Sequence, residues 1–257
     1  MNNPVYDCFL YNGEAKMLNF RLHELNDLVD FFIIGESSYT FKGDPKPLTL
    51  SSIKEILKPF ASKIIYVTND IAPTANAWEN EKNQRDSLIE GFRGKEIKSS
   101  DIIILSDVDE IPDLDFLANA KKSGISGAHT CYQNFYYYST SFRKMNKWPG
   151  TVILNARTFK EQFNGSFEYV RQSRHQLPLI GSKGDFSSGG WHFSYFGDVD
   201  YIIKKIQSFS HQEYNNARYT DPEKIKQLMK EGKDLFFRSG EDLVEVNDEV
   251  YRPKFIH

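Results

Sequence analysis

Asp101-Ile-Ile-Ile-Leu-Ser-Asp-Val-Asp-Glu-Ile-Pro112 is the stretch of sequence that decides the fold. Its four apolar residues, Ile102 to Leu105, are typical of a buried strand, and Pro112 stops the strand. The strand therefore delivers three acids to its carboxyl end: Asp107, Asp109 and Glu110. Because three carboxylates so close together repel one another, the pattern indicates a divalent cation that holds a diphosphate.

Strand and helix patterns alternate through the first part of the chain. Residues 5–10, 30–35 and 63–68 are predicted strands, and residues 14–30 and 76–92 carry apolar side chains at helical spacing. Such alternation predicts an α/β fold with a mostly parallel central sheet flanked by helices. In open sheets of this type ligands bind at the carboxyl ends of the strands, where the three acids lie.

Beyond Asp113 the pattern changes, and the predicted strands follow one another without a long helix between them. The predicted elements are strands at 129–138, 151–155 and 191–196, a loop at 171–190, and amphipathic helices at 199–209 and 222–237. No internal repeat or low-complexity linker divides the chain. The sequence therefore predicts one domain over residues 1–257 with helices at its C-terminal end.

Composition excludes some classes of partner. The chain has 257 residues, with 32 basic and 35 acidic ones, so no basic stripe indicates nucleic acid or an anionic membrane. No apolar run approaches the roughly 20 residues that cross a bilayer, and no signal peptide is visible, so a cytoplasmic protein is expected. Cys8 and Cys131 are expected to be reduced core residues rather than a disulfide or metal pair.

Aromatic residues are unusually frequent, at 14% of the chain. Many of them must fill the core, but ring faces also stack on the C–H faces of sugars. Composition alone does not show whether the additional aromatic residues lie in the core or in a sugar-binding cleft.

Asp107 and Asp109 form a DxD element. Residues two apart on an extended segment point the same way, so both carboxylates would face one site. Mn²⁺ or Mg²⁺ takes one or two carboxylates plus substrate phosphates, and the alternative is a pair of solvated loop acids. Glu110 is a candidate general base or indirect metal ligand, or else a turn cap.

Two residues on the first half are candidates for the bound nucleotide. Glu36, at the end of a predicted strand, would accept a hydrogen bond from a nucleobase or ribose hydroxyl, or would cap a loop. Arg85 would face the diphosphate, or would form an ordinary helix-surface ion pair with Glu81.

A second cluster, Ser187-Ser-Gly-Gly-Trp-His-Phe-Ser194, lies in the second half. Its two glycines permit close backbone approach to a ligand, and Trp191 is a candidate for stacking on a sugar. His192 is a candidate metal ligand, although a His beside aromatic residues is often a core residue. Asp185, in the preceding loop, is a second candidate base, and Lys183 a candidate phosphate partner.

These blocks occur in an order that resembles glycosyltransferase family 17. The resemblance spans roughly residues 6–207 and rests on these blocks: Tyr6-Asp-Cys-Phe, Asn12-Gly-Glu14, Phe32-Ile-Ile-Gly-Glu-Ser37, Phe41 with Gly43, Pro45 and Pro47, Leu105-Ser-Asp-Val-Asp-Glu-Ile-Pro112, Trp148-Pro-Gly-Thr151 and Gly190-Trp-His-Phe-Ser194. It implies a GT-A-like fold, in which residues 1–112 bind a nucleotide sugar and residues 113–257 face the acceptor.

The resemblance also implies inverting transfer from a nucleotide-sugar donor, UDP-N-acetylglucosamine (UDP-GlcNAc), to a glycan hydroxyl. Asp109 would hold the metal, and Asp107 would lie near the ribose or a metal-bound water. The acceptor would belong to a surface polysaccharide or glycoprotein glycan, with peripheral membrane contact if it is lipid-linked. Two alternatives stay open: a DxD phosphatase or nucleotidyltransferase, and a non-catalytic carbohydrate-binding protein. Haloacid-dehalogenase-type phosphatases carry their DxD on the first strand, whereas here it follows the fourth.

Overall fold

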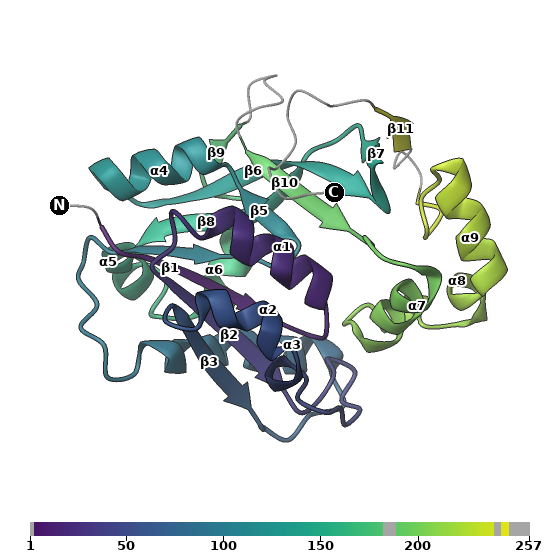
Figure 1. Ribbon diagram of the computed structural model, residues 1–257, viewed down its shortest axis with the longest axis horizontal. Helices are drawn as coiled ribbons and strands as arrows, with labels where there is room; N and C mark the ends of the chain where they lie inside the picture. The colour runs from purple at the N-terminus through teal and green to yellow at the C-terminus, as the bar shows by residue number, and fades with distance from the viewer. Residues whose placement is uncertain (1–2, 182–188, 239–242, 247–257) are drawn as a thin grey trace.

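The computed structural model of the chain describes residues 3–181, 189–238 and 243–246 (Figure 1). Asp185 and Lys183, two of the residues singled out in the sequence, lie outside these ranges. In the described part the strand order of the main sheet is β11-β7-β6-β8-β4-β1-β2-β3. It is a mixed sheet that helices flank on both faces.

Four strands form the parallel part of the sheet. They are β3 (Ile64–Asn69), β2 (Phe31–Ser37), β1 (Val5–Leu10) and β4 (Ile102–Leu105), in that order, and all three pairings are parallel. The bounds of β1 and β4 are those that the sequence predicts. Their carboxyl ends meet at one edge, so the acids after β4 lie beside the loop after β1.

The pleat of these strands separates two hydrophobic clusters. On one face, residues such as Val5, Phe9 and Ile104 pack against α1 (Ala15–Leu25), which lies across the sheet in Figure 1. On the other face, Cys8 and Leu105 pack with residues of the 3₁₀ turn 87–92 and of two short helices, α5 (Ala156–Glu161) and α6 (Phe167–Ser173). The parallel sheet is therefore covered on both sides, as its apolar runs require.

The remaining strands correct the expectation of a mostly parallel sheet. β8 (Trp148–Asn155) pairs antiparallel with β4, and β6 (Ala128–Tyr137), β7 (Ser139–Lys144) and β11 (Leu243–Glu245) continue antiparallel. Consecutive strands without a long helix between them are joined by short turns, which reverse the chain. Two further short strands are β5 (Glu110–Pro112) and β9 (Leu179–Ile180).

Strand β10 (Gly190–Ser194) is held on both sides. It pairs parallel with β6 and antiparallel with β5, so that His192 lies opposite both Phe135 and Glu110. Gly189, just before the strand, lies close to another part of the backbone rather than to a ligand: a Cβ at this position would lie 2.0 Å from the carbonyl oxygen of Tyr132. The glycines thus serve strand packing in this structure.

The other helices follow local sequence signals. Asp113 caps α4 (Leu114–Ser123) by accepting a hydrogen bond from Phe116 N, the usual role of an aspartate at a helix start. The remaining helices are α2 (Lys54–Leu57), α3 (Ala77–Asp86), α7 (Val199–Ser208), α8 (Ala217–Thr220) and α9 (Pro222–Glu231). Helix α9 ends earlier than predicted, because Gly232 adopts the left-handed conformation that terminates helices.

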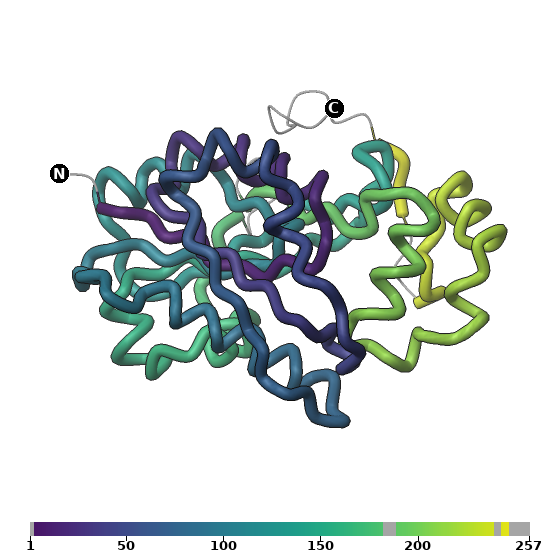
Figure 2. Tube along the Cα trace, turned by 60° about the horizontal axis from the view of Figure 1, so that its bottom comes forward, coloured from purple at the N-terminus to yellow at the C-terminus, as the bar shows by residue number. Residues whose placement is uncertain are grey.

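The C-terminal helices form a third hydrophobic cluster. Ile202 and Ile206 of α7 and Ile225 of α9 pack with Tyr137 and Phe236. Figure 2 shows this green-to-yellow part of the chain at the opposite end of the molecule from the N-terminus. Within the described residues, no helix combines the length and apolar character needed to span a membrane.

Candidate active site

A cavity of about 530 Å³ opens at the carboxyl ends of β1 and β4. Its wall includes the loops after β1 and β4, the helices α3 and α6, the segment from β10 to α7, and residues of β6, β8 and the C-terminal part of the chain. Charged side chains on the wall are Glu14, Glu81, Arg85, Asp107, Asp109, Glu168, Arg171, Arg174, Lys205 and Arg238. The charges nearest to the DxD element form two groups.

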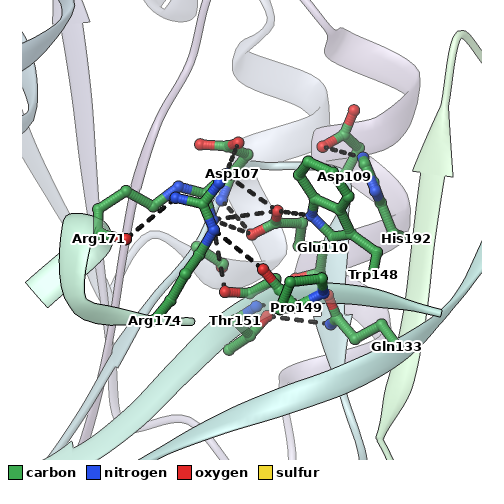
Figure 3. A network of polar contacts seen from close by, with 12 residues as sticks. Asp107, Asp109, Glu110, Gln133, Trp148, Pro149, Thr151, Arg171, Arg174 and His192 are labelled. Atoms are coloured by element: carbon green, nitrogen blue, oxygen red, sulfur yellow. Dashed lines mark hydrogen bonds and ion pairs between the residues drawn. The ribbon is translucent and has the colours of Figure 1, made fainter. Parts of the chain in front are cut away.

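The first group, which we call the arginine side, consists of Asp107, Glu110, Arg85, Arg171 and Arg174. Figure 3 shows Asp107 and Glu110 with Arg171 and Arg174. Arg171 Nη2 donates to Asp107 Oδ2 at 2.6 Å, and Arg85 lies 3.6 Å from Asp107 Oδ1. Burial alone would raise the pKa of Asp107, but the three arginines lower it well below its ordinary value. Asp107 is therefore a carboxylate at every physiological pH.

Glu110 is sealed within the arginine side. Its side chain is 0% exposed, and it does not line the cavity. Arg171 Nη1 donates to both of its oxygens at 3.1 and 3.0 Å, and Trp148 Nε1 donates to Oε1 at 2.7 Å. The backbone N–H of Asp107 donates to Oε2 at 3.0 Å. These contacts fit a residue that shapes the acid loop better than one that takes a proton from an acceptor.

The second group, the lysine side, consists of Asp109, His192, Lys205 and Glu14. Lys205 Nζ of α7 donates to Asp109 Oδ2 at 2.7 Å, and His192 Nε2 lies 3.6 Å from Asp109 Oδ1. Burial lowers the pKa of Lys205, but Asp109 and its other neighbours raise it further, so the net change is upward and the ammonium stays charged. Asp109 therefore has one oxygen paired and one oxygen facing an imidazole.

His192 is held by rings rather than by hydrogen bonds. It stacks on Phe135 with the ring centroids 4.5 Å apart and lies 5.2 Å from the ring of Trp148. Its Nδ1 is buried without a hydrogen-bond partner among the described residues. Burial lowers the pKa of His192, which leaves a neutral imidazole whose Nε2 faces Asp109.

Glu14, which follows β1, is the unpaired acid of the cavity wall. Its Oε2 accepts a hydrogen bond from Asn12 N at 2.7 Å, whereas the other wall carboxylates form ion pairs within 4.0 Å in the described structure. Burial raises the pKa of Glu14.

The residues present fit a divalent cation in part. Asp109 Oδ1 and His192 Nε2 offer an oxygen and a nitrogen donor at one point of the cavity wall. Among residues 3–181, 189–238 and 243–246, no group of three or more His, Cys, Asp or Glu side chains is arranged to hold a metal by itself. This donor set suits an ion that completes its shell with substrate oxygens, as Mg²⁺ and Mn²⁺ do on phosphates.

Arg85 of α3 forms the i,i+4 ion pair with Glu81 that its sequence position allows, but it is buried rather than at the helix surface. It lines the cavity beside Asp107, and it also forms short ion pairs with Glu81 and Glu168.

Glu36 and Trp191, two further sequence candidates, do not line this cavity. Glu36 is buried and accepts hydrogen bonds from Thr49 N, Leu50 N and Tyr66 Oη, so it caps the loop that follows β2. Trp191 is 4% exposed in the hydrophobic cluster beneath α1. Because neighbouring residues of a strand point to opposite faces, His192 faces the cavity and Trp191 faces the core.

Sequence reasoning named Arg85 but missed the other cations of the site and one aromatic residue. Arg171 was assigned to a loop but lies in α6, and Lys205 was placed on a helix without a role. Nothing near either residue in sequence signals its partner. Trp148 did carry a signal, because it belongs to one of the blocks on which the family resemblance rests.

Comparison with known proteins gives the class and then the family. The sequence model of a glycosyltransferase family matches residues 1–243, which is most of the chain. The protein therefore belongs to glycosyltransferase family 17.

Three curated relatives carry the name beta-1,4-mannosyl-glycoprotein 4-beta-N-acetylglucosaminyltransferase. The proteins from Homo sapiens and Rattus norvegicus are each 32% identical to this chain over 115 residues, and that from Mus musculus is 31% identical over 115 residues. These matches cover 42% of this chain and 21–22% of each relative. The match thus spans about a fifth of the length of these relatives.

Proposed function

We propose that the protein transfers N-acetylglucosamine from UDP-GlcNAc to a hydroxyl group of a glycan, with inversion at the anomeric carbon and with Mn²⁺ or Mg²⁺ as cofactor. The observation that carries the proposal is one cavity wall on which the DxD carboxylates pair with three cations, Arg85, Arg171 and Lys205, and face the imidazole of His192. Family membership and the printed activity of the relatives support the choice of reaction and donor.

The arrangement of the strands supports the interpretation of the fold as GT-A-like. The parallel strands run in the order β3-β2-β1-β4, and the DxD element follows the last of them at the ligand-binding edge. In this reading the donor nucleotide lies along the ends of β1 and β4. The acceptor enters from the side of the C-terminal helices.

Asp109 and His192 would hold the metal, with Asp107 beside it. The bound ion would neutralise charge on the leaving diphosphate. Arg85, Arg171 and Arg174 would supply fixed positive charge at the same place and would keep the acid loop in position. Bidentate guanidinium groups suit this task because their donors match phosphate and carboxylate oxygens.

A base must remove the proton of the acceptor hydroxyl. Of the two sequence candidates, Glu110 is held by Arg171 and Trp148, which leaves Asp185 as the base in this proposal. Asp185→Asn is expected to lower kcat by about 10²-fold or more while leaving UDP affinity unchanged. A variant with normal kcat would remove Asp185 from the mechanism.

A donor screen tests the function as a whole. Purified protein is incubated with UDP-, GDP- and CMP-sugars, with Mn²⁺ or with a chelator, and nucleotide release is measured. We expect hydrolysis of UDP-GlcNAc that requires Mn²⁺. Phosphate release from simple phosphomonoesters would instead identify a phosphatase, and glycan binding that ignores UDP and Mn²⁺ would identify a carbohydrate-binding protein.

A further inference from the structure

Lys205 occupies the position where a cation would meet Asp109. Its Nζ lies 2.7 Å from Asp109 Oδ2, and the two side chains are 22% and 7% exposed. An ammonium group and a divalent metal that share one carboxylate repel each other, and little water is present to screen the repulsion. In its present position Lys205 therefore opposes a metal ion at Asp109.

Few contacts hold the lysine in that position. It comes from α7, whose apolar face packs into the C-terminal cluster, whereas Asp109 comes from the loop after β4. Among the described residues its ion pair within 4.0 Å is with Asp109, it donates a hydrogen bond to the Tyr201 hydroxyl on the same helix, and its Nζ lies 5.4 Å from the centre of the Tyr195 ring. A lysine has a flexible four-carbon stem, and the side chain already lines the cavity.

Arg171 shows what a fixed cation looks like in the same cavity. Its guanidinium donates to Asp107, to both oxygens of Glu110 and to the carbonyl oxygen of Gly150. Movement of Arg171 would break several hydrogen bonds and leave Glu110 buried without its cation. Movement of Lys205 would break one ion pair, with Asp109, and one hydrogen bond, with Tyr201 of its own helix, and a bound diphosphate would replace the lost anion.

We propose that Lys205 neutralises Asp109 in the empty enzyme and moves onto the diphosphate of the nucleotide when metal and donor bind together. Lys205 is thus a donor-phosphate-binding residue that makes metal binding depend on the nucleotide. The proposal rests on the proposed function, since it assumes a metal ion at Asp109 and a diphosphate in the cavity.

Mn²⁺ binding followed by electron paramagnetic resonance tests the proposal. We expect Lys205→Met to bind Mn²⁺ without nucleotide at least about 10-fold more tightly than the unaltered protein, because the competing charge is gone. With Mn²⁺ saturating, the same variant should bind UDP about 10-fold more weakly, because the diphosphate loses a cation. Lys204→Met is the matched control, since Lys204 is the exposed neighbour on α7 and should change neither affinity.

A second variant protects the test against a folding defect. Lys205→Gln keeps a donor for Asp109 but carries no charge, so it should also bind Mn²⁺ more tightly without nucleotide.

The possible failures are distinguishable. If both Lys205 variants bind Mn²⁺ no more tightly than the unaltered protein, while that protein binds Mn²⁺ with UDP, the role of Lys205 is wrong and the proposed function stands. If the unaltered protein binds neither Mn²⁺ nor UDP in any combination, both proposals are wrong.

Discussion

The two sides of the cavity treat neighbouring acids in opposite ways. On the arginine side, Glu110 and Asp107 are held by Arg171 through several hydrogen bonds, and Glu110 has no exposed surface. On the lysine side, Asp109 has one close ion pair and faces a histidine that has an unsatisfied nitrogen. Asp109 and Glu110 are adjacent in sequence, yet Glu110 is held by several hydrogen bonds, whereas Asp109 has a single close ion pair, which we propose is exchanged for a metal ion.

This difference indicates that the arginine side keeps the acid loop in position and that the lysine side contacts a ligand. Buried charges are tolerable when hydrogen bonds satisfy them, and breaking such a network leaves an uncompensated charge. Polar atoms that remain unsatisfied in a native structure are, by contrast, frequent at functional sites. We therefore expect substitutions on the arginine side to cost stability and substitutions on the lysine side to cost binding.

The largest effect is expected for Arg171→Met. Removing the guanidinium leaves Glu110 buried and unpaired, which should lower the free energy of unfolding by about 3–5 kcal/mol. Urea denaturation measures the change. Arg93→Met is the control, because Arg93 forms an exposed ion pair with Glu90 worth about 0.5 kcal/mol or less. Equal losses in the two variants would contradict a sealed arginine side.

Asp109→Asn is expected to act on function instead. The amide keeps the size of the side chain but lacks the charge that a metal needs, so metal-dependent UDP binding should weaken by about 100-fold or more. Calorimetric titration of UDP in Mn²⁺ gives the affinity, and urea denaturation should show a change within about 1 kcal/mol. Asp115→Asn, an exposed change on α4, serves as the matched control. Unchanged UDP affinity in Asp109→Asn would remove Asp109 from the metal site.

His192→Phe should separate binding from stability in a single variant. The phenyl ring keeps the stack on Phe135 and removes the unsatisfied Nδ1, so the free energy of unfolding should rise by about 1 kcal/mol. Affinity for Mn²⁺ in the presence of UDP should fall by about 10-fold, because Nε2 is lost. A variant that is both less stable and unchanged in Mn²⁺ affinity would mean that His192 is a core residue alone.

The smallest effect is expected for Glu14→Gln, and it should depend on pH. The folded-state pKa of Glu14 is raised, so the native protein is penalised when this carboxyl ionises and loses stability as pH rises through that pKa. Glutamine removes the penalty but still accepts the hydrogen bond from Asn12 N. The variant should be more stable than the unaltered protein at pH 7, and the difference should vanish below about pH 4. Thermal melting at both pH values checks the sign.

The parallel half of the fold and the DxD element could be predicted because their signals are local. Four consecutive apolar residues and the acids behind them fix both β4 and the position of Asp107 and Asp109. The antiparallel half was harder to predict from the sequence, because short strands joined by turns carry weaker periodic signals than strand–helix units. The absence of a long predicted helix between residues 138 and 151 was the available clue.

The partners of the acids could not be predicted, because pairing depends on tertiary structure. Arg171 lies 64 residues from Asp107, and Lys205 lies 96 residues from Asp109. The different placement of Trp191 and His192 has a simpler reason. Adjacent residues of a strand cannot share a face, and this rule was available from the sequence.

The double pairing of β10 has a consequence for how this segment can change. With β5 on one side and β6 on the other, the strand cannot slide without breaking two ladders of hydrogen bonds at once. Inserting or deleting a single residue within Gly190–Ser194 would therefore exchange the two faces of the strand, so that the Trp191 side chain would point into the polar cavity and the His192 side chain into the hydrophobic core. Length variation has to be absorbed before Gly189 or after Tyr195, and two-residue changes would be better tolerated than one-residue changes.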